Sequence, residues 1–241
     1  MFNKNKINFL MTYEIDINEN FTDHKSLLNM NYKGICINKE FTPGDKLSEY
    51  NYFQLPFSVY KKLTLNLTVN NTKSPIKLPQ HDILSASCDD QPTFHYICEK
   101  YDTDLISLDL SKPLFLIKES MVRKAVQRNI FFEIKMVYGL YSEKTYFIRN
   151  VQTLLNYTKG KNIIFSSGAH ILTELKTEED IMCFLSILNV KNSWLKRIKE
   201  NKEKFFCSVA AKKYIYKSCV VSEVDEGPLK RDFILSKFDG L

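Results

Sequence analysis

Few residues of this sequence have the spacing that catalytic or metal-binding motifs require. The four histidines, His24, His81, His95 and His170, are isolated, and no His-x-His or His-Glu-x-x-His pair occurs. Glycine-rich phosphate loops and the Gly-x-Ser-x-Gly nucleophile motif do not occur either. The six cysteines lack the close pairs of a zinc site, so we interpret most of them as buried apolar residues. The sequence therefore predicts neither catalytic residues nor a protein-bound metal.

Basic residues are concentrated in two segments of the second half. Residues 191–217 hold nine basic and two acidic side chains, and residues 112–149 hold eight and three. Compositional bias would scatter lysines evenly, whereas clustered positive charge is typical of a surface that binds a polyanion. The alternative is a solvated helix face held by Lys–Glu pairs, but two acids cannot balance nine bases. We predict nucleic-acid contacts from Lys144, Arg149, Lys191, Lys196, Arg197, Lys199, Lys202, Lys204, Lys212 and Lys213.

A second candidate site follows a short apolar run late in the chain. Ser166, Ser167 and Gly168 come directly after Asn162–Phe165, which is expected to be a strand. Small hydroxyl residues and free amides at the carboxyl end of a barrel strand are suited to binding phosphate. These three residues are therefore a candidate anion site, and a tight strand-to-loop transition is the alternative. Asp16 and Asp109, near other strand ends, are weaker catalytic candidates.

Short apolar runs alternate with helical patterns along the chain. This rhythm predicts parallel strands covered by helices, as in a small β/α barrel or an open doubly wound sheet. The expected strands are 12–17, 33–38, 63–69, 82–87, 104–110, 129–137 and 162–165. The expected helices are 23–31, 89–101, 120–128, 143–158, 178–188 and 192–204.

The composition fits one globular domain with a short tail. Of the 241 residues, 44% are hydrophobic and 26% are charged, which excludes a disordered chain. No apolar run approaches the ~20 residues of a membrane span, and residues 1–10 lack the apolar stretch of a secretory signal. We expect a single domain over 1–218 and a loosely ordered tail over 219–241.

Several segments together resemble a known family. They are Asn129-Ile-Phe-Phe-Glu-Ile, the helix end Leu154-Leu-Asn-Tyr-Thr-Lys-Gly-Lys-Asn, Ile163-Ile-Phe-Ser-Ser-Gly-Ala and Glu174-Leu-Lys-Thr-Glu-Glu-Asp-Ile. The sequence is similar to the thirty-kilodalton protein subunit of ribonuclease P, which is shared with ribonuclease MRP in eukaryotes. The similarity spans roughly residues 12–215 and is most specific over 129–185.

The resemblance implies a fold and a role. The fold is a distorted seven-stranded β/α (TIM-like) barrel resembling the polymerase-and-histidinol-phosphatase barrel. Those enzymes carry metal ligands on a His-x-His of the first strand, where this chain reads Tyr13-Glu-Ile-Asp-Ile-Asn18, so the resemblance implies a barrel without metal chemistry. The RNA subunit of the family performs the cleavage, with Mg²⁺ acting through that RNA, and the protein binds no cofactor of its own.

The implied partners follow from the same resemblance. They are ribonuclease P RNA, with MRP RNA and hence rRNA processing as further candidates, a small α/β protein subunit, and precursor tRNA as the substrate of the complex. The implied location is the nucleus, with no membrane contact. Two other functions stay open at this point, namely a barrel metal-dependent phosphoesterase with an unusual ligand set and a scaffold that binds only proteins.

Overall fold

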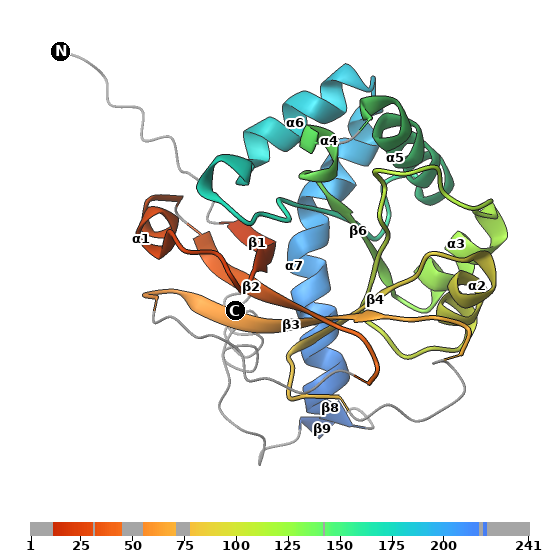
Figure 1. The fold of residues 1–241 in the computed structure, drawn as a ribbon, viewed down its shortest axis with the longest axis horizontal. Coiled ribbons are helices and arrows are strands. Elements are labelled where there is room, and N and C mark those ends of the chain that lie inside the picture. The colour runs from red at the N-terminus through yellow and green to blue at the C-terminus, as the bar shows by residue number, and fades with distance from the viewer. Residues whose placement is uncertain are drawn as a thin grey trace.

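Seven parallel strands form the centre of the fold, in the same order in space as in the chain (Figure 1). The structure is a computed structural model that describes residues 12–30, 32–44, 55–70, 78–141, 143–216 and 219–220. The strands are β1 (Thr12–Asn18), β2 (Tyr32–Phe41), β3 (Ser58–Asn66), β4 (Ile83–Ser87), β5 (Leu105–Ser107), β6 (Phe131–Lys135) and β7 (Ile163–Ser166). All six neighbouring pairs are parallel, which confirms the predicted βα architecture.

The sheet nearly closes on itself between its first and last strands. An isolated parallel bridge joins Ile17 to Ala169, and the Asn18 N–H donates to the Ala169 carbonyl over 2.9 Å. The Gly168 N–H donates to the Asp16 carbonyl over 3.1 Å. These bonds are fewer than those of a full ladder, so the strands form a distorted, nearly closed barrel, as predicted from the resemblance.

Helices cover the outside of the barrel. They are α1 (His24–Leu27), α2 (Gln91–Glu99), α3 (Glu119–Gln127), α4 (Tyr138–Tyr141), α5 (Lys144–Thr158), α6 (Glu178–Ile187) and α7 (Asn192–Tyr214), with 3-10 turns at Leu28–Met30 and Leu172–Glu174. Asp90 caps α2, and Thr177 forms a capping box with Asp180 at α6, as their positions in the sequence indicate. In contrast, α3 has no side-chain cap and begins at Glu119, one residue before the expected start at 120.

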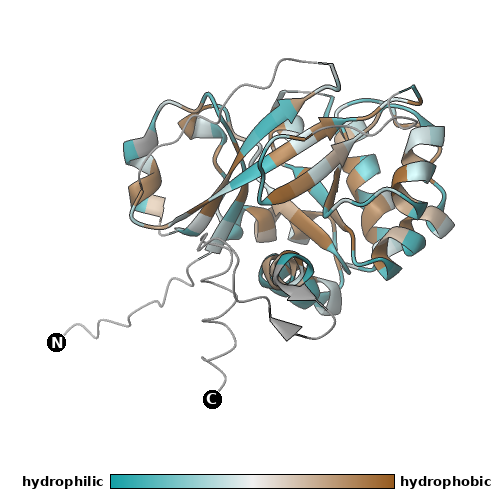
Figure 2. Cartoon of the chain, turned by 90° about the horizontal axis from the view of Figure 1, so that it is seen from below, coloured by the Kyte–Doolittle hydropathy of each residue, from teal (hydrophilic) through white to brown (hydrophobic). Residues whose placement is uncertain are grey.

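The apolar core has three clusters, one of them around the first two strands, and the other two arise because alternate residues of a strand face opposite sides. On β6, Phe132 and Ile134 belong to the outer core beneath the helices, whereas Phe131 belongs to a second cluster. In this second cluster, side chains from the strands pack against one face of α7, and its members include Tyr60, Ile83, Leu105, Phe131, Ile164, Phe205, Phe206 and Val209. Figure 2 shows α7 nearly end-on beneath the sheet.

Helix α7 crosses the amino ends of the strands and seals that end of the barrel. Its Asn201 donates to the carbonyls of Gly160 and Ile163, before and at the start of β7. Farther along, the side chain of Ser208 accepts a bond from Asn129, just before β6. One long helix therefore makes polar contacts at successive strand starts and covers the apolar base of the barrel.

Two element bounds differ clearly from the sequence prediction. Strand β3 begins at Ser58 rather than at residue 63, because Lys62 points inward to carboxylates and so belongs to the strand. Helix α7 runs to Tyr214 rather than to residue 204, because Phe205, Phe206 and Val209 continue its buried face.

The predicted domain boundary lies next to a small hairpin. Strands β8 (Ile215–Tyr216) and β9 (Cys219–Val220) pair antiparallel directly after α7. The hairpin places residues 219 and 220 against the end of the predicted domain. The rest of the predicted tail, 221–241, lies outside the described residues.

Replacing Asn201 tests the attachment of α7. Asn201 is 3% exposed, and its amide donates over 3.0 Å and 2.7 Å to the two carbonyls. Asn201→Ala leaves buried acceptors unpaired, so we expect a loss of about 2–4 kcal/mol in the free energy of unfolding, measured in urea. The exposed Glu203 on the same helix provides the control, since Glu203→Gln should change stability by less than about 0.5 kcal/mol. Equal stability of the two variants would contradict this role of Asn201.

Candidate nucleic-acid interface

A buried ammonium group occupies the interior of the barrel. The Lys62 Nζ, from β3, lies 2.5 Å from Asp16 Oδ2 of β1 and 2.6 Å from both carboxylate oxygens of Glu133 of β6. All three side chains are at most 3% exposed. Because an unpaired charge at this depth would be strongly unfavourable, the three groups stabilise one another as a set.

Lys135 balances the charge of this cluster. Its Nζ lies 3.1 Å from Asp16 Oδ2 and 3.9 Å from Glu40 Oε1. Burial disfavours the charged carboxylate of Asp16, but the nearby Lys135 and Lys62 ammonium groups outweigh this effect and lower the pKa of Asp16 to about 2. Burial also acts against the charge on Lys135, yet Asp16 and Glu133 raise its pKa above the ordinary lysine value. Asp16 and Lys135 therefore both stay charged at neutral pH.

The donors of the predicted anion site bind groups of the chain itself. The Ser166 hydroxyl donates to Glu133 Oε1 over 2.9 Å, and the Ser167 amide and hydroxyl donate to the two oxygens of Glu14, each over 2.9 Å. The Gly168 amide donates to the Asp16 carbonyl. Both serines have no exposed surface. An external phosphate would have to displace buried carboxylates, so these residues do not form an open anion site.

The cluster also does not resemble a metal centre. Within the described part of the chain, no group of three or more His, Cys, Asp or Glu side chains is placed to hold a metal ion. The acids of the interior instead surround lysines, whose positive charge occupies the space that a cation would need. His170 lies outside this cluster on the exposed surface, where its backbone amide donates to Glu174 Oε2.

The sequence analysis identified Asp16 only as a weak catalytic candidate and missed Lys62, Glu133 and Lys135. One signal was available, because Glu133 and Lys135 interrupt an apolar run at alternate positions and must therefore share one face of the strand. Lys62 gave no such signal, since it follows Lys61 and precedes a strand that was expected to begin one residue later.

Removing the central ammonium should destabilise the barrel. Lys62→Met leaves Asp16 and Glu133 buried with less positive charge, so we expect a loss of about 3–5 kcal/mol in the free energy of unfolding at pH 7. The loss should be smaller at pH 5, because Asp16 loses one of the two ammonium groups that lower its pKa and can then take up a proton more readily. In the wild type, by contrast, the contribution of Asp16 is complete above about pH 4 and is lost only as the pH falls towards its folded pKa of about 2.

A double variant provides the control. Lys62→Met combined with Glu133→Gln removes one charge of each sign and should recover part of the lost stability. Urea unfolding at pH 5 and pH 7 measures both effects. A single variant as stable as the wild type at pH 7 would show that the ammonium is not required.

Three of the predicted nucleic-acid lysines hold α7 against the barrel. Lys202 is only 9% exposed, and its Nζ donates to the Tyr13 carbonyl over 2.8 Å. Lys212 lies 2.6 Å from Asp102 and 3.0 Å from Asp104, and the Nζ of Lys213 donates to the His81 carbonyl over 2.7 Å. These contacts tie the helix to the amino ends of β1, β4 and β5, so these cations are already used within the chain. Of the others, Lys204 is paired with Glu200 over 2.7 Å on the helix surface.

The remaining cations of α7 meet a basic turn that precedes β7. The Arg197 Nη1 donates to the Lys159 carbonyl over 3.1 Å, and Lys191 lies over the Trp194 ring at 5.6 Å from its centroid. A side chain at Gly160 would meet Trp194 atoms at 3.0 Å, so only glycine lets the helix approach this closely. We define the basic face as Lys159, Lys161, Lys191, Lys196, Arg197 and Lys199.

The acidic neighbour of the basic face, Glu200, pairs with Lys204 rather than with a cation of the face. Within the part of the chain that the structure describes, none of its six cations forms a salt bridge. Five of them are exposed, and Arg197 is half-buried. Six positive charges that form no salt bridge give a surface suited to phosphate groups, and lysine ammonium groups bind phosphate as point charges.

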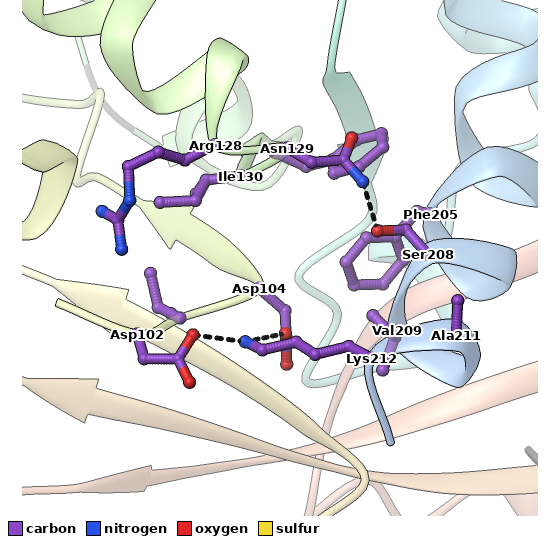
Figure 3. Close-up of a pocket in the computed structure, with 12 residues that line it drawn as sticks. Asp102, Asp104, Arg128, Asn129, Ile130, Phe205, Ser208, Val209, Ala211 and Lys212 are labelled. Carbon is purple, nitrogen blue, oxygen red and sulfur yellow. Dashed lines mark hydrogen bonds and ion pairs between the residues drawn. The ribbon is translucent and has the colours of Figure 1, made fainter. Parts of the chain in front are cut away.

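A recess farther along α7 has a different character (Figure 3). It has a volume of about 390 Å³ and lies between α7 and the residues that lead into β5 and β6. Asp102 and Asp104 bind Lys212 across it, and Asn129 donates to Ser208 on its other side. The carboxylates of Asp102 and Asp104 offset the positive charges of Arg128 and Lys212, which also line the recess. The recess is therefore not part of the basic face.

The two predicted contacts from the other basic segment lie on a different helix. Lys144 and Arg149 are exposed in the first half of α5, whereas the turn that Arg197 contacts follows the end of this helix. The structure therefore does not bring all ten predicted residues together. It joins four of them, Lys191, Lys196, Arg197 and Lys199, with Lys159 and Lys161 of the turn before β7.

Comparisons with known proteins place this chain in a family. The family model described as RNase P subunit p30 matches residues 11–214. The protein GAMETOPHYTE DEFECTIVE 1 of Arabidopsis thaliana is 36% identical over 179 residues, which cover 70% of this chain and 31% of that protein. Ribonuclease P protein subunit p30 of Mus musculus is 29% identical over 138 residues, covering 52% of this chain and 50% of that protein. The chain thus matches between about a third and a half of the length of these relatives.

A solved structure supports the fold. A chain in a cryo-EM structure of archaeal ribonuclease P with mature tRNA aligns with a TM-score of 0.64 and 18% identity, covering 88% of this chain and 99% of that chain. The family model matches nearly all of the described barrel, including β1 to β7 and the whole of α7. The chain therefore belongs to the RNase P subunit p30 family.

Proposed function

We propose that this chain is a non-catalytic protein subunit of the ribonuclease P ribonucleoprotein, which removes the 5′ leader of precursor tRNA. The observation that carries the proposal is the family match over residues 11–214, together with an unpaired basic face on the same domain. The match to archaeal ribonuclease P adds a fold that is compatible with such a complex.

The basic face is the proposed contact with the RNA subunit. Lys196 and Lys199 are exposed on α7, and Lys159 and Lys161 flank the turn that Arg197 holds. A folded RNA brings phosphates close together, so cations that neutralise them lower the cost of assembly. The rigid contact between the turn and α7 fixes the spacing of these charges.

Cleavage is assigned to the RNA subunit, with Mg²⁺ held by that RNA. The ion pairs of the barrel interior favour this assignment over a metal-dependent phosphoesterase, because Lys62 and Lys135 already pair with Asp16 and Glu133. Another protein subunit, MRP RNA and a nuclear location complete the proposal. They rest on the family and on the eukaryotic relatives that carry the subunit name.

The RNA that co-purifies with the chain tests the proposal. We expect ribonuclease P RNA in a native purification through a tag on this chain, and no cleavage of precursor tRNA by protein that has been freed of RNA. A purification that contains protein partners but no such RNA would favour the scaffold alternative. Magnesium-dependent cleavage by the RNA-free protein would support the phosphoesterase instead.

Exchanging two lysines tests the basic face. Lys196→Gln with Lys199→Gln should flatten the slope of log affinity against log salt for the co-purified RNA by about 1–2 units, at about 0.7–0.9 per lost phosphate contact. Both lysines are exposed and have no ion-pair partner in the described structure, so the fold should be retained.

The matched control changes the same number of lysines on another part of the surface. Lys25 and Lys118 are both exposed. Lys25 lies in α1, which follows β1, and Lys118 directly precedes α3, which follows β5. Both positions therefore follow the carboxyl ends of strands, away from α7 at the amino ends. Lys25→Gln with Lys118→Gln should leave the slope unchanged within about half a unit. An equal change in both double variants would mean that the chain binds RNA through its net charge alone.

A further inference from the structure

A groove on the outer side of α5 is left unused by the proposed RNA contact. It has a volume of about 230 Å³ and lies between α5 and the extended segment 113–117. Tyr146, Arg149 and Tyr157 contribute one helical stripe to it, and Leu116 contributes the opposite wall. Leu116 is 72% exposed, which is unusual for a large aliphatic side chain beside other apolar groups.

The wall segment belongs to no helix, strand or turn of the described structure. Phe115 packs on Phe94 with ring centroids 5.4 Å apart and Ile117 is 6% exposed, so these two side chains anchor the segment to the core, whereas Leu116 lies on the surface. Within the described part of the chain, the peptide groups from Leu114 to Ile117 form no hydrogen bond with another residue. Such a row of free donors and acceptors can pair with an added strand.

The segment is held in this shape at both ends. The Asn150 amide of α5 donates to the carbonyls of Leu110 and Lys112 over 3.0 Å and 2.9 Å. At the other end, the Lys118 carbonyl accepts the first bond of α3 from Met121. Because its ends are fixed, the segment would lose little conformational freedom when a partner binds.

We propose that this groove binds an extended segment of another protein, which adds as a strand beside Leu114–Ile117. An apolar side chain of the partner rests on Leu116 between the two tyrosines, and a carboxylate of the partner pairs with Arg149. The inference rests on the proposed function in one respect, since that function places the chain among other protein subunits.

Charge and main-chain chemistry define this partner. Arg149 is exposed and has no acidic partner within the described residues, so it calls for a carboxylate or a phosphate. A nucleic acid could supply the phosphate and stack bases on the tyrosines. It has no peptide groups to pair with the free main chain, however, and an aliphatic wall of Pro113, Leu114 and Leu116 offers no stacking surface. A polypeptide satisfies all of these features together.

The test uses the native complex purified through a tag on the full-length chain. A photo-crosslinking amino acid at position 116 should join the chain to a protein that is present in stoichiometric amount in that complex. The control position is 187, because Ile187 is 78% exposed on α6 and lies outside the groove. Amide hydrogen exchange should also slow at least about tenfold at Leu114–Leu116 in the complex relative to the free chain.

Variants then separate this inference from the proposed function. Leu116→Asp and Arg149→Glu should each reduce the crosslinked protein in the complex at least about tenfold while ribonuclease P RNA is retained, whereas Arg149→Lys and Ile187→Asp should retain both. Crosslinking of position 116 to RNA, or full retention of the protein in Leu116→Asp with no amide protection, would overturn the groove inference. Absence of ribonuclease P RNA from the wild-type complex would overturn the proposed function instead.

Discussion

The buried contact of Lys62 with Asp16 and Glu133 determines how the barrel interior can be used. It links β1, β3 and β6, which lie on different sides of the barrel, and it pairs each buried charge with one of opposite sign. Once Lys135 is added, the interior contains two lysines against Asp16 and Glu133. A charged substrate entering this space would disturb that balance, so binding surfaces have to be found on the outside of the barrel.

In α7, too, some charged side chains bind groups of the chain itself and others face the solvent. The sequence counts nine basic residues over 191–217, yet Lys202, Lys212 and Lys213 bind carbonyls and carboxylates at the amino ends of the strands. These three cations fix the long helix across the base of the barrel, where its apolar face covers the second core cluster. The number of charged residues in a sequence segment therefore overestimates the charge available at the surface. Only the contacts in the folded chain show which cations are bound internally and which are exposed.

The sequence predicted the elements with strong local signals. All seven strands were placed, as were helices α2 and α6, because hydrophobic runs and capping residues act over a few neighbours. The start of β3 and the partners of Ser166 and Ser167 could not be predicted in this way. They depend on Lys62 meeting Asp16 across 46 residues and on Ser167 meeting Glu14 across 153 residues, and a single sequence carries no record of such distant pairs.

The turn at Lys159–Asn162 lies between the groove beside α5 and the basic face. It begins at the end of α5, two residues after Tyr157 of the groove, and Lys159 adopts a left-handed conformation with a φ of 54°. Trp194, Arg197 and Asn201 of α7 all contact this turn. Close-packed protein interiors are hardly compressible. A shift of α5 along its axis would therefore move the turn against α7. A protein bound along α5 and an RNA bound at the basic face would thus share one rigid support, so each of them stabilises the position of the charges or side chains that the other contacts.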